Sequence, residues 1–165
     1  MNIIKQYLGF KNILKYKNTF IIKTCVSDMS SPTIILKKVK NSDAKFLYEL
    51  LAEREPKTFV FHKKMPTYEE HVKFVKSKPY SKWYIIKLGN KSVGSISLTH
   101  KNEIGIWIKK NMHYKGIGTQ ALKILMKKNP GLRYLANINP KNRESVRFFE
   151  KNEFKLIQYT YELIN

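Results

Sequence analysis

Two glycines, Gly116 and Gly118, lie where an apolar, strand-like run gives way to a helical pattern. Glycines at such a junction let successive main-chain N–H groups converge on one anion, and the positive end of the helix dipole adds favourable charge. A pyrophosphate is the natural occupant of a turn of this kind. The simpler alternative is a glycine turn that only starts a helix.

A dinucleotide site is the first pyrophosphate site to test, because Gly116, Gly118 and Ala121 match the pattern G-x-G-x-x-G/A. That pattern belongs to a strand–helix–strand unit, with an acidic residue about 20 residues further on that holds a ribose. Here Asn137 and Asn139 occupy that region, and the preceding strands form an antiparallel meander. The sequence therefore excludes a Rossmann-type site.

The elements that must position this turn follow from the hydrophobic pattern and from capping residues. Thr67 and Glu70 form a capping box, which predicts that a helix starts there. Three apolar runs separated by short polar turns predict the antiparallel meander. In chain order the sequence predicts a strand at 33–39, helices at 41–54 and 67–75, strands at 83–88, 93–100 and 103–108, a helix at 118–128, a strand at 134–138, a helix at 142–151 and one or two strands within 154–163. This order predicts a three-layer α/β domain built on a mixed sheet.

The same turn resembles the acetyl-CoA signature of the GNAT acetyltransferases, Q/R-x-x-G-x-G/A, which is present here from His113 to Gly118. A later block that starts with Asn142 and Ser145 resembles that family's N-x-x-S/A…(E)K-x-G-F block. The resemblance covers 33–165 and implies an N-acetyltransferase domain. It implies a three-layer α/β GNAT-type fold, in which helices flank a mixed, mostly antiparallel central sheet.

Three residues depart from the family's pattern. His113 stands where the signature has Gln or Arg, at a position where backbone amides make most of the ligand contacts. Glu153 stands where the family usually has glycine after the helix, so Asn152 is expected to take the left-handed position. Phe149 stands where many relatives carry a tyrosine that protonates the leaving thiolate. The resemblance therefore does not name the group that protonates the thiolate here.

The resemblance implies acetyl-CoA as the co-substrate, and no metal. The N–H near Ile108 is expected to polarise the thioester carbonyl, as an oxyanion donor does. Asn142 is expected to hydrogen-bond the pantetheine arm, to cap its helix, or to do both. The residues expected to bind acetyl-CoA are Ile106, Ile108, His113, Tyr114, Lys115, Gly116, Ile117, Gly118, Thr119, Asn142 and Ser145.

Amine acetylation needs a neutral amine, whereas a free alkyl ammonium has a pKa of about 10. A base or a desolvating pocket must therefore remove a proton. Glu103 is the only Asp or Glu between Glu70 and Glu144, and it begins the strand that leads to the glycine turn. In the family an acid here often accepts the proton, commonly through water, so Glu103 is the expected base; the alternative is that it pairs with a nearby lysine. His62 lies in the loop that lines the acceptor pocket in the family and is expected to contact the acceptor.

These motifs do not identify the acceptor. The chain has 32 Lys and Arg against 12 Asp and Glu, a net charge of +20, which favours anionic partners. We therefore expect the primary amine of a small molecule, such as a nucleotide-linked amino-sugar, although an AT-rich genome explains the same abundance of lysine. Two alternatives stay open: transfer to a protein N-terminus or lysine, and a non-catalytic, nucleic-acid-associated module on the same fold, for which no motif is present.

Residues 1–32 are a predicted basic N-terminal extension, outside the domain at 33–165. Lysines interrupt its apolar runs, so no secretory signal is predicted. No apolar run of the sequence is long enough for a transmembrane helix. The single cysteine, Cys25, excludes an intramolecular disulfide and predicts a reducing, cytoplasmic setting.

Overall fold

The computed structural model describes residues 33–55, 64–131, 133–161 and 163. The predicted extension at 1–32 and the predicted acceptor residue His62 lie outside these residues. Among the helices that are described, none has the length and apolar character needed to cross a bilayer.

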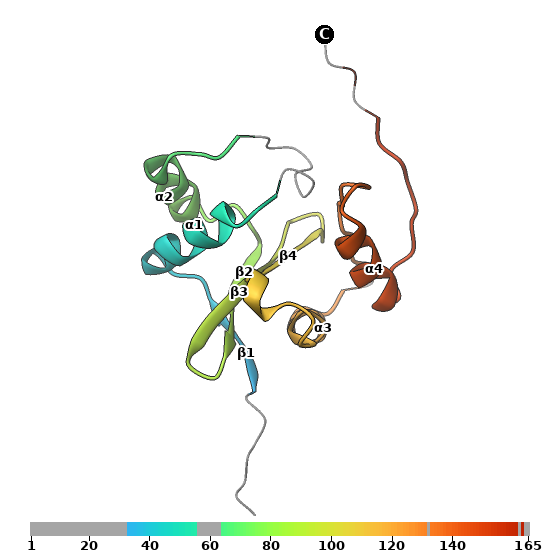
Figure 1. Cartoon of the computed structure of the whole chain (residues 1–165), viewed down its shortest axis with the longest axis horizontal. Helices are drawn as coiled ribbons and strands as arrows, with labels where there is room; N and C mark the ends of the chain where they lie inside the picture. Colours follow the sequence, from blue (N-terminus) through green and yellow to red (C-terminus); the bar gives the residue numbers. More distant parts are fainter. Residues whose placement is uncertain (1–32, 56–63, 132, 162, 164–165) are drawn as a thin grey trace, which may run out of the picture. The chain divides into compact units, whose positions relative to one another are not determined.

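The centre of the fold is an antiparallel sheet of four strands in the order β1-β2-β3-β4 (Figure 1). The strands are β1 at Ile34–Lys38, β2 at Lys82–Leu88, β3 at Lys91–Leu98 and β4 at Ile104–Ile108. Isoleucine recurs in all four, and its branched Cβ suits a pleated, half-buried surface. The predicted meander of β2, β3 and β4 is confirmed.

Helices cover both faces of the sheet, which gives the three layers (Figure 1). One face packs against α1 and α2 through Leu47, Val75 and Ile85. The other packs against α3, where Leu122 and Leu125 are fully buried. The helices are α1 at Ala44–Ala52, α2 at Tyr68–Lys76, α3 at Ile117–Lys128 and α4 at Arg143–Lys151, and short 3-10 helices precede α1 (η1, Asn41–Asp43) and α3 (η3, Lys110–Met112). The predicted fold class is therefore confirmed.

Side-chain caps begin two of the helices where the sequence predicts. The Glu70 N–H donates to Thr67 Oγ1 at 3.2 Å, and the Thr67 N–H donates to Glu70 Oε2 at 2.8 Å. Asn142 Oδ1 accepts the N–H of Ser145 at 3.1 Å. These bonds satisfy main-chain donors that a helix leaves unpaired in its first turn. They place the beginnings of α2 and α4 through contacts between close neighbours in the sequence.

The strand predicted at 134–138 is reduced to a single parallel bridge, between Leu135 and Glu103. The Ile104 N–H donates to Leu135 O at 2.8 Å. The ladder does not continue beyond this bridge, and the Asn137 side chain donates from Nδ2 to the Glu103 carboxylate at 3.1 Å. Past Ile104, the outer edge of β4 has no neighbouring strand among the described residues.

The left-handed residue after α4 is Glu153, and the prediction of Asn152 is wrong. Glu153 has a φ of 69°, whereas Asn152 has a φ of −98°. Asn152 Nδ2 donates to Phe148 O at 2.7 Å, which holds Asn152 at the helix end. The chain therefore turns one residue later, where the Phe154 N–H reaches Phe149 O at 3.0 Å and the two rings pack with centroids 5.0 Å apart.

No strand forms in the described residues after α4, where the sequence predicts one or two. The chain at 154–161 is extended without a ladder, and apolar side chains such as Leu156 and Tyr161 are 70% and 91% exposed. A strand needs a neighbouring edge for its N–H and C=O groups. None of the described edges pairs with this segment, so its alternating apolar pattern does not become a strand here.

Candidate active site

A cavity of about 470 Å³ lies where the end of β4, the turn into α3 and the start of α4 meet. Every residue predicted to bind acetyl-CoA lines it: Ile106, Ile108, His113, Tyr114, Lys115, Gly116, Ile117, Gly118, Thr119, Asn142 and Ser145. Glu103, the predicted base, is not among the lining residues. The structure thus brings three separate stretches of the sequence to one cavity and leaves the predicted base outside its lining.

The outer edge of β4 presents main-chain N–H groups to this cavity. In the antiparallel pairing of β3 with β4, bonded residue pairs alternate with unbonded ones, so the N–H groups of Ile104, Ile106 and Ile108 point away from β3. The Ile104 N–H donates to Leu135 O. The N–H groups of Ile106 and Ile108 have no strand beside them among the described residues. Donors fixed in this way can polarise a carbonyl or pair with an extended amide chain.

Gly116 makes the tight turn into α3. Its φ of 73° lies in the left-handed region, and a Cβ at this position would meet no atom within 4 Å. The need for glycine is therefore conformational and not steric. The N–H groups that follow, from Ile117 to Thr119, have no carbonyl partner one turn earlier in the helix. They are free to bind an anion at the positive end of α3.

Gly118 shapes the site through packing as well as through its main chain. A Cβ at this position would lie 2.9 Å from Cε2 of Phe148. The missing side chain makes room for the Phe148 ring, which reaches α3 from α4. Gly118 and Phe148 both line the cavity, so this contact forms part of its wall.

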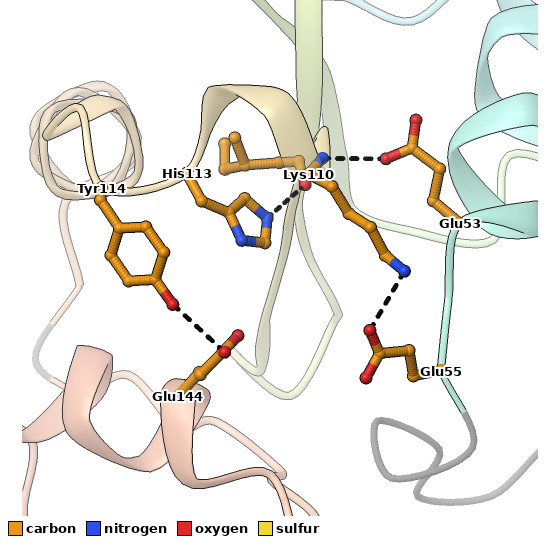
Figure 2. A network of polar contacts seen from close by, with 7 residues as sticks. Glu53, Glu55, Lys110, His113, Tyr114 and Glu144 are labelled. Atoms are coloured by element: carbon orange, nitrogen blue, oxygen red, sulfur yellow. Dashed lines mark hydrogen bonds and ion pairs between the residues drawn. The ribbon is translucent and has the colours of Figure 1, made fainter.

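Two side chains of the glycine-turn signature hold the turn against its surroundings, as Figure 2 shows. His113 Nε2 lies 2.9 Å from Ile108 O, and because a carbonyl can only accept, the ring donates from Nε2. The residue that departs from the family's Gln or Arg thus ties the turn to the end of β4. The Tyr114 hydroxyl donates to Glu144 Oε1 at 3.2 Å and ties the same turn to α4.

Charged side chains that the sequence predictions missed also line the cavity. Glu53 caps the end of α1, and Glu55 lies two residues further on. Both contact Lys110, whose N–H donates to Glu53 Oε2 at 2.9 Å and whose Nζ lies 3.1 Å from Glu55 Oε1 (Figure 2). Arg147 and Lys151 come from one face of α4. The spacing of four between Arg147 and Lys151 on a helix was a usable signal, as was the carboxylate of Glu53 at the negative end of α1.

The family described as Acetyltransferase (GNAT) domain matches residues 33–155. The chain belongs to this family. It is an N-acetyltransferase, and acetyl-CoA is its acyl donor. No curated protein sequence matches the chain.

Solved structures share the fold of this GNAT enzyme. A domain from Methanocaldococcus jannaschii is 28% identical with a TM-score of 0.68, over 79% of this chain and 93% of that one. An acetyltransferase from Thermus thermophilus is 22% identical with a TM-score of 0.65, over 78% of this chain and 90% of that one. A ribosomal L7/L12 alpha-N-protein acetyltransferase in complex with coenzyme A is 22% identical with a TM-score of 0.64, over 78% of this chain and 83% of that one.

In this GNAT domain Glu103 lies at the bridge that joins the start of β4 to Leu135. The Thr99 hydroxyl donates to Glu103 Oε2 at 3.0 Å, and Asn137 Nδ2 donates to Oε1 at 3.1 Å. The carboxylate is thus held at both oxygens by neutral groups, and no described lysine forms an ion pair with it. A proton that passes from the cavity to Glu103 must travel through an intervening group such as a water molecule.

Trp107 lines the cavity, and the Arg54 guanidinium stacks over it with Cζ 4.8 Å from the ring centroid. Burial lowers the pKa of Arg54, and the nearby Tyr80 partly opposes this shift. Burial raises the pKa of Tyr80, and Arg54 in turn opposes that. At neutral pH Arg54 remains a cation and Tyr80 remains neutral. The wall behind Trp107 therefore carries a fixed positive charge.

Phe149 lies in the core and not in the cavity lining of this enzyme. It is buried, and its ring packs against Phe148 and Phe154 with centroid distances of 5.0 Å. A phenyl ring has no proton to give to a thiolate. Among the residues that do line the cavity, Tyr114, Thr119 and Ser145 carry hydroxyl groups.

Proposed function

We propose that this enzyme moves the acetyl group of acetyl-CoA directly onto a primary amine of a small molecule. The observation that carries the proposal is the cavity in which the turn into α3 and the free edge of β4 meet. The turn offers N–H donors to phosphate groups, and β4 offers N–H donors to a carbonyl. A coenzyme-A thioester carries both kinds of group on one molecule.

Direct transfer forms one bond and breaks another. The amine nitrogen attacks the thioester carbon, the carbonyl oxygen gains negative charge, and the C–S bond breaks to release the coenzyme-A thiolate. We assign the Ile108 N–H as donor to that oxygen, a role worth about 10²- to 10³-fold in rate in other enzymes. No cysteine is among the described residues that line the cavity, which supports transfer without a covalent enzyme intermediate.

We propose Glu103 as the group that finally receives the amine's proton. Its support is its place at the bridge between the start of β4 and Leu135, and the two hydrogen bonds that hold its carboxylate there. Because Glu103 does not line the cavity, a bridging water carries the proton in this scheme. The free amine, and not its ammonium form, is then the attacking species.

We infer that the acceptor carries an anionic group, as a nucleotide-linked amino-sugar does. The net charge of +20 supports this, because such a field draws anions to the enzyme. A protein N-terminus is the second candidate, since one structure with this fold is named as a ribosomal L7/L12 alpha-N-protein acetyltransferase.

A thiol-release assay with acetyl-CoA distinguishes these acceptors. The panel contains nucleotide-linked amino-sugars, their N-acetylated forms, unblocked peptides and the same peptides with acetylated N-termini. We expect thiol release with the free amino-sugars and none with either acetylated control. Release with unblocked peptides alone would favour the second candidate. Salt-dependent RNA binding by a protein that acetyl-CoA does not stabilise would contradict both and favour the nucleic-acid-associated module.

A further inference from the structure

Lys110 is the first residue beyond the sheet on the way from β4 to the glycine turn, and a distant side chain holds its main chain. The N–H of Lys109 still bonds Val93 O, at 2.9 Å, within the pairing of β3 with β4. The N–H of Lys110 bonds Glu53 Oε2 at 2.9 Å instead, although Glu53 lies 57 residues earlier in the sequence. Because η3 begins at Lys110 and leads to His113, this bond sets where the cofactor turn begins.

Glu53 stands at a position that local preference disfavours. It is the C-cap residue of α1, where the helix dipole opposes a carboxylate. The last turn of α1 has no basic residue to compensate. A hydrogen bond from a main-chain N–H to a carboxylate is charge-assisted and belongs to the stronger class. The contact with Lys110 therefore stabilises a carboxylate that α1 alone would not.

The far end of the same loop is already tied to β4, by the bond between His113 and Ile108 O. Glu53 ties the near end, and it does so from α1, a different element (Figure 2). We propose that Glu53 is a positioning residue for acetyl transfer: by fixing the main chain of Lys110, it holds η3 and the glycine turn in register with the Ile108 N–H. This inference rests on the proposed function, because the register matters only if one ligand spans the turn and the strand.

The neighbouring contact of Glu55 cannot have the same role. It joins the side chain of Lys110 and not its main chain, and the two side chains are 59% exposed for Lys110 and 44% exposed for Glu55. Exposed ion pairs contribute little and leave the backbone free to move. The positioning effect therefore comes from the hydrogen bond that the Lys110 N–H donates to Glu53.

Three substitutions of Glu53 distinguish the effect of its hydrogen-bonding oxygen from the effect of its negative charge. Glu53→Ala removes the acceptor, and kcat/KM for acetyl-CoA should fall by about 10- to 100-fold, as it does when reacting groups are slightly misplaced. The KM for the amine should not change. Glu53→Gln keeps a carbonyl oxygen at the same reach and should retain most of the wild-type kcat/KM. Glu53→Asp keeps the charge but shortens the reach, and should resemble Glu53→Ala. Glu49→Ala changes an exposed residue of α1 outside the cavity lining and should behave like wild type.

Amide hydrogen exchange at Lys110 reports the contact without any enzymatic activity. The amide should be protected in wild type and in Glu53→Gln, and should exchange fast in Glu53→Asp and Glu53→Ala; if Glu53→Ala does not fold, the Gln and Asp variants decide the question. Fast exchange in wild type, or a Glu53→Asp enzyme equal to wild type, would overturn the proposal. A rise in the amine KM alone would also overturn it, because Glu53 would then contact the acceptor.

The same experiments keep the two proposals apart. If wild type releases no thiol with any amine, the proposed function fails. Amide exchange at Lys110, together with calorimetric binding of acetyl-CoA to wild type and the Glu53 variants, then still tests whether Glu53 holds the cofactor turn. Unchanged acetyl-CoA affinity in a folded Glu53→Ala variant would reject the positioning role in that case.

Discussion

Replacement of Gly116 by alanine tests whether the left-handed turn holds the acetyl-CoA site. An L residue at the φ of 73° is strained by about 1–2 kcal/mol. No steric term is added, because a Cβ there meets no atom within 4 Å. If the folded protein keeps the turn, the melting temperature falls by about 2–4 °C per kcal/mol. If the turn relaxes instead, its N–H groups no longer point at the phosphate groups of acetyl-CoA. Each 1.4 kcal/mol of binding free energy lost in this way weakens acetyl-CoA binding about tenfold.

Gly89 offers a matched control for this experiment. It also has a positive φ, of 56°, and open space at its Cβ, but it lies in the turn between β2 and β3 and does not line the cavity. Gly89→Ala should lower the melting temperature by a similar amount and leave acetyl-CoA affinity unchanged. Scanning calorimetry gives the first quantity and titration calorimetry the second. If Gly116→Ala binds acetyl-CoA as tightly as Gly89→Ala does, the assignment of the turn as the phosphate site is refuted.

Glu103→Gln should lower turnover by about two to four orders of magnitude with little change in acetyl-CoA affinity, and higher pH should partly restore turnover because more of the amine arrives neutral. Gly118→Ala should destabilise the fold by about 1–3 kcal/mol through overpacking against Phe148, and adding Phe148→Leu should recover part of this in urea unfolding. Burial lowers the pKa of His71 below its ordinary value of about 6.5. The unfolded chain then binds the proton more readily than the folded protein does. The free energy of unfolding should therefore keep its full value above about pH 6.5 and decrease as the pH falls below it. His71→Phe should flatten that decrease.

Each of these has a result that counts against it. Wild-type turnover by Glu103→Gln at neutral pH would remove Glu103 from the mechanism and leave solvent or another group as the proton acceptor. A Gly118→Ala defect that Phe148→Leu does not relieve would mean that overpacking against the Phe148 ring is not its cause. An acid limb of equal slope in wild type and His71→Phe would assign the pH dependence to other groups.

Features that depend on near neighbours in the chain were predictable from the sequence. Thr67 and Glu70, three residues apart, form the predicted capping box, and Asn142 caps α4 through Ser145, also three residues away. The predicted acetyl-CoA residues share one cavity, because most of them belong to one turn and the cap of one helix. Such contacts form wherever the local backbone forms, so residue type and spacing are enough to predict them.

Features that depend on distant partners were decided by the tertiary structure. The bond from the Lys110 N–H to Glu53 joins residues 57 apart, and the parallel bridge of Leu135 joins it to Glu103. The same holds for the close approach of Gly118 to Phe148. In each case the partner is chosen by how the layers pack, and residue spacing carries no information about which surfaces meet. The strand predicted after α4 fails for the same reason: its alternating pattern is local, but a strand exists only where another edge accepts its hydrogen bonds.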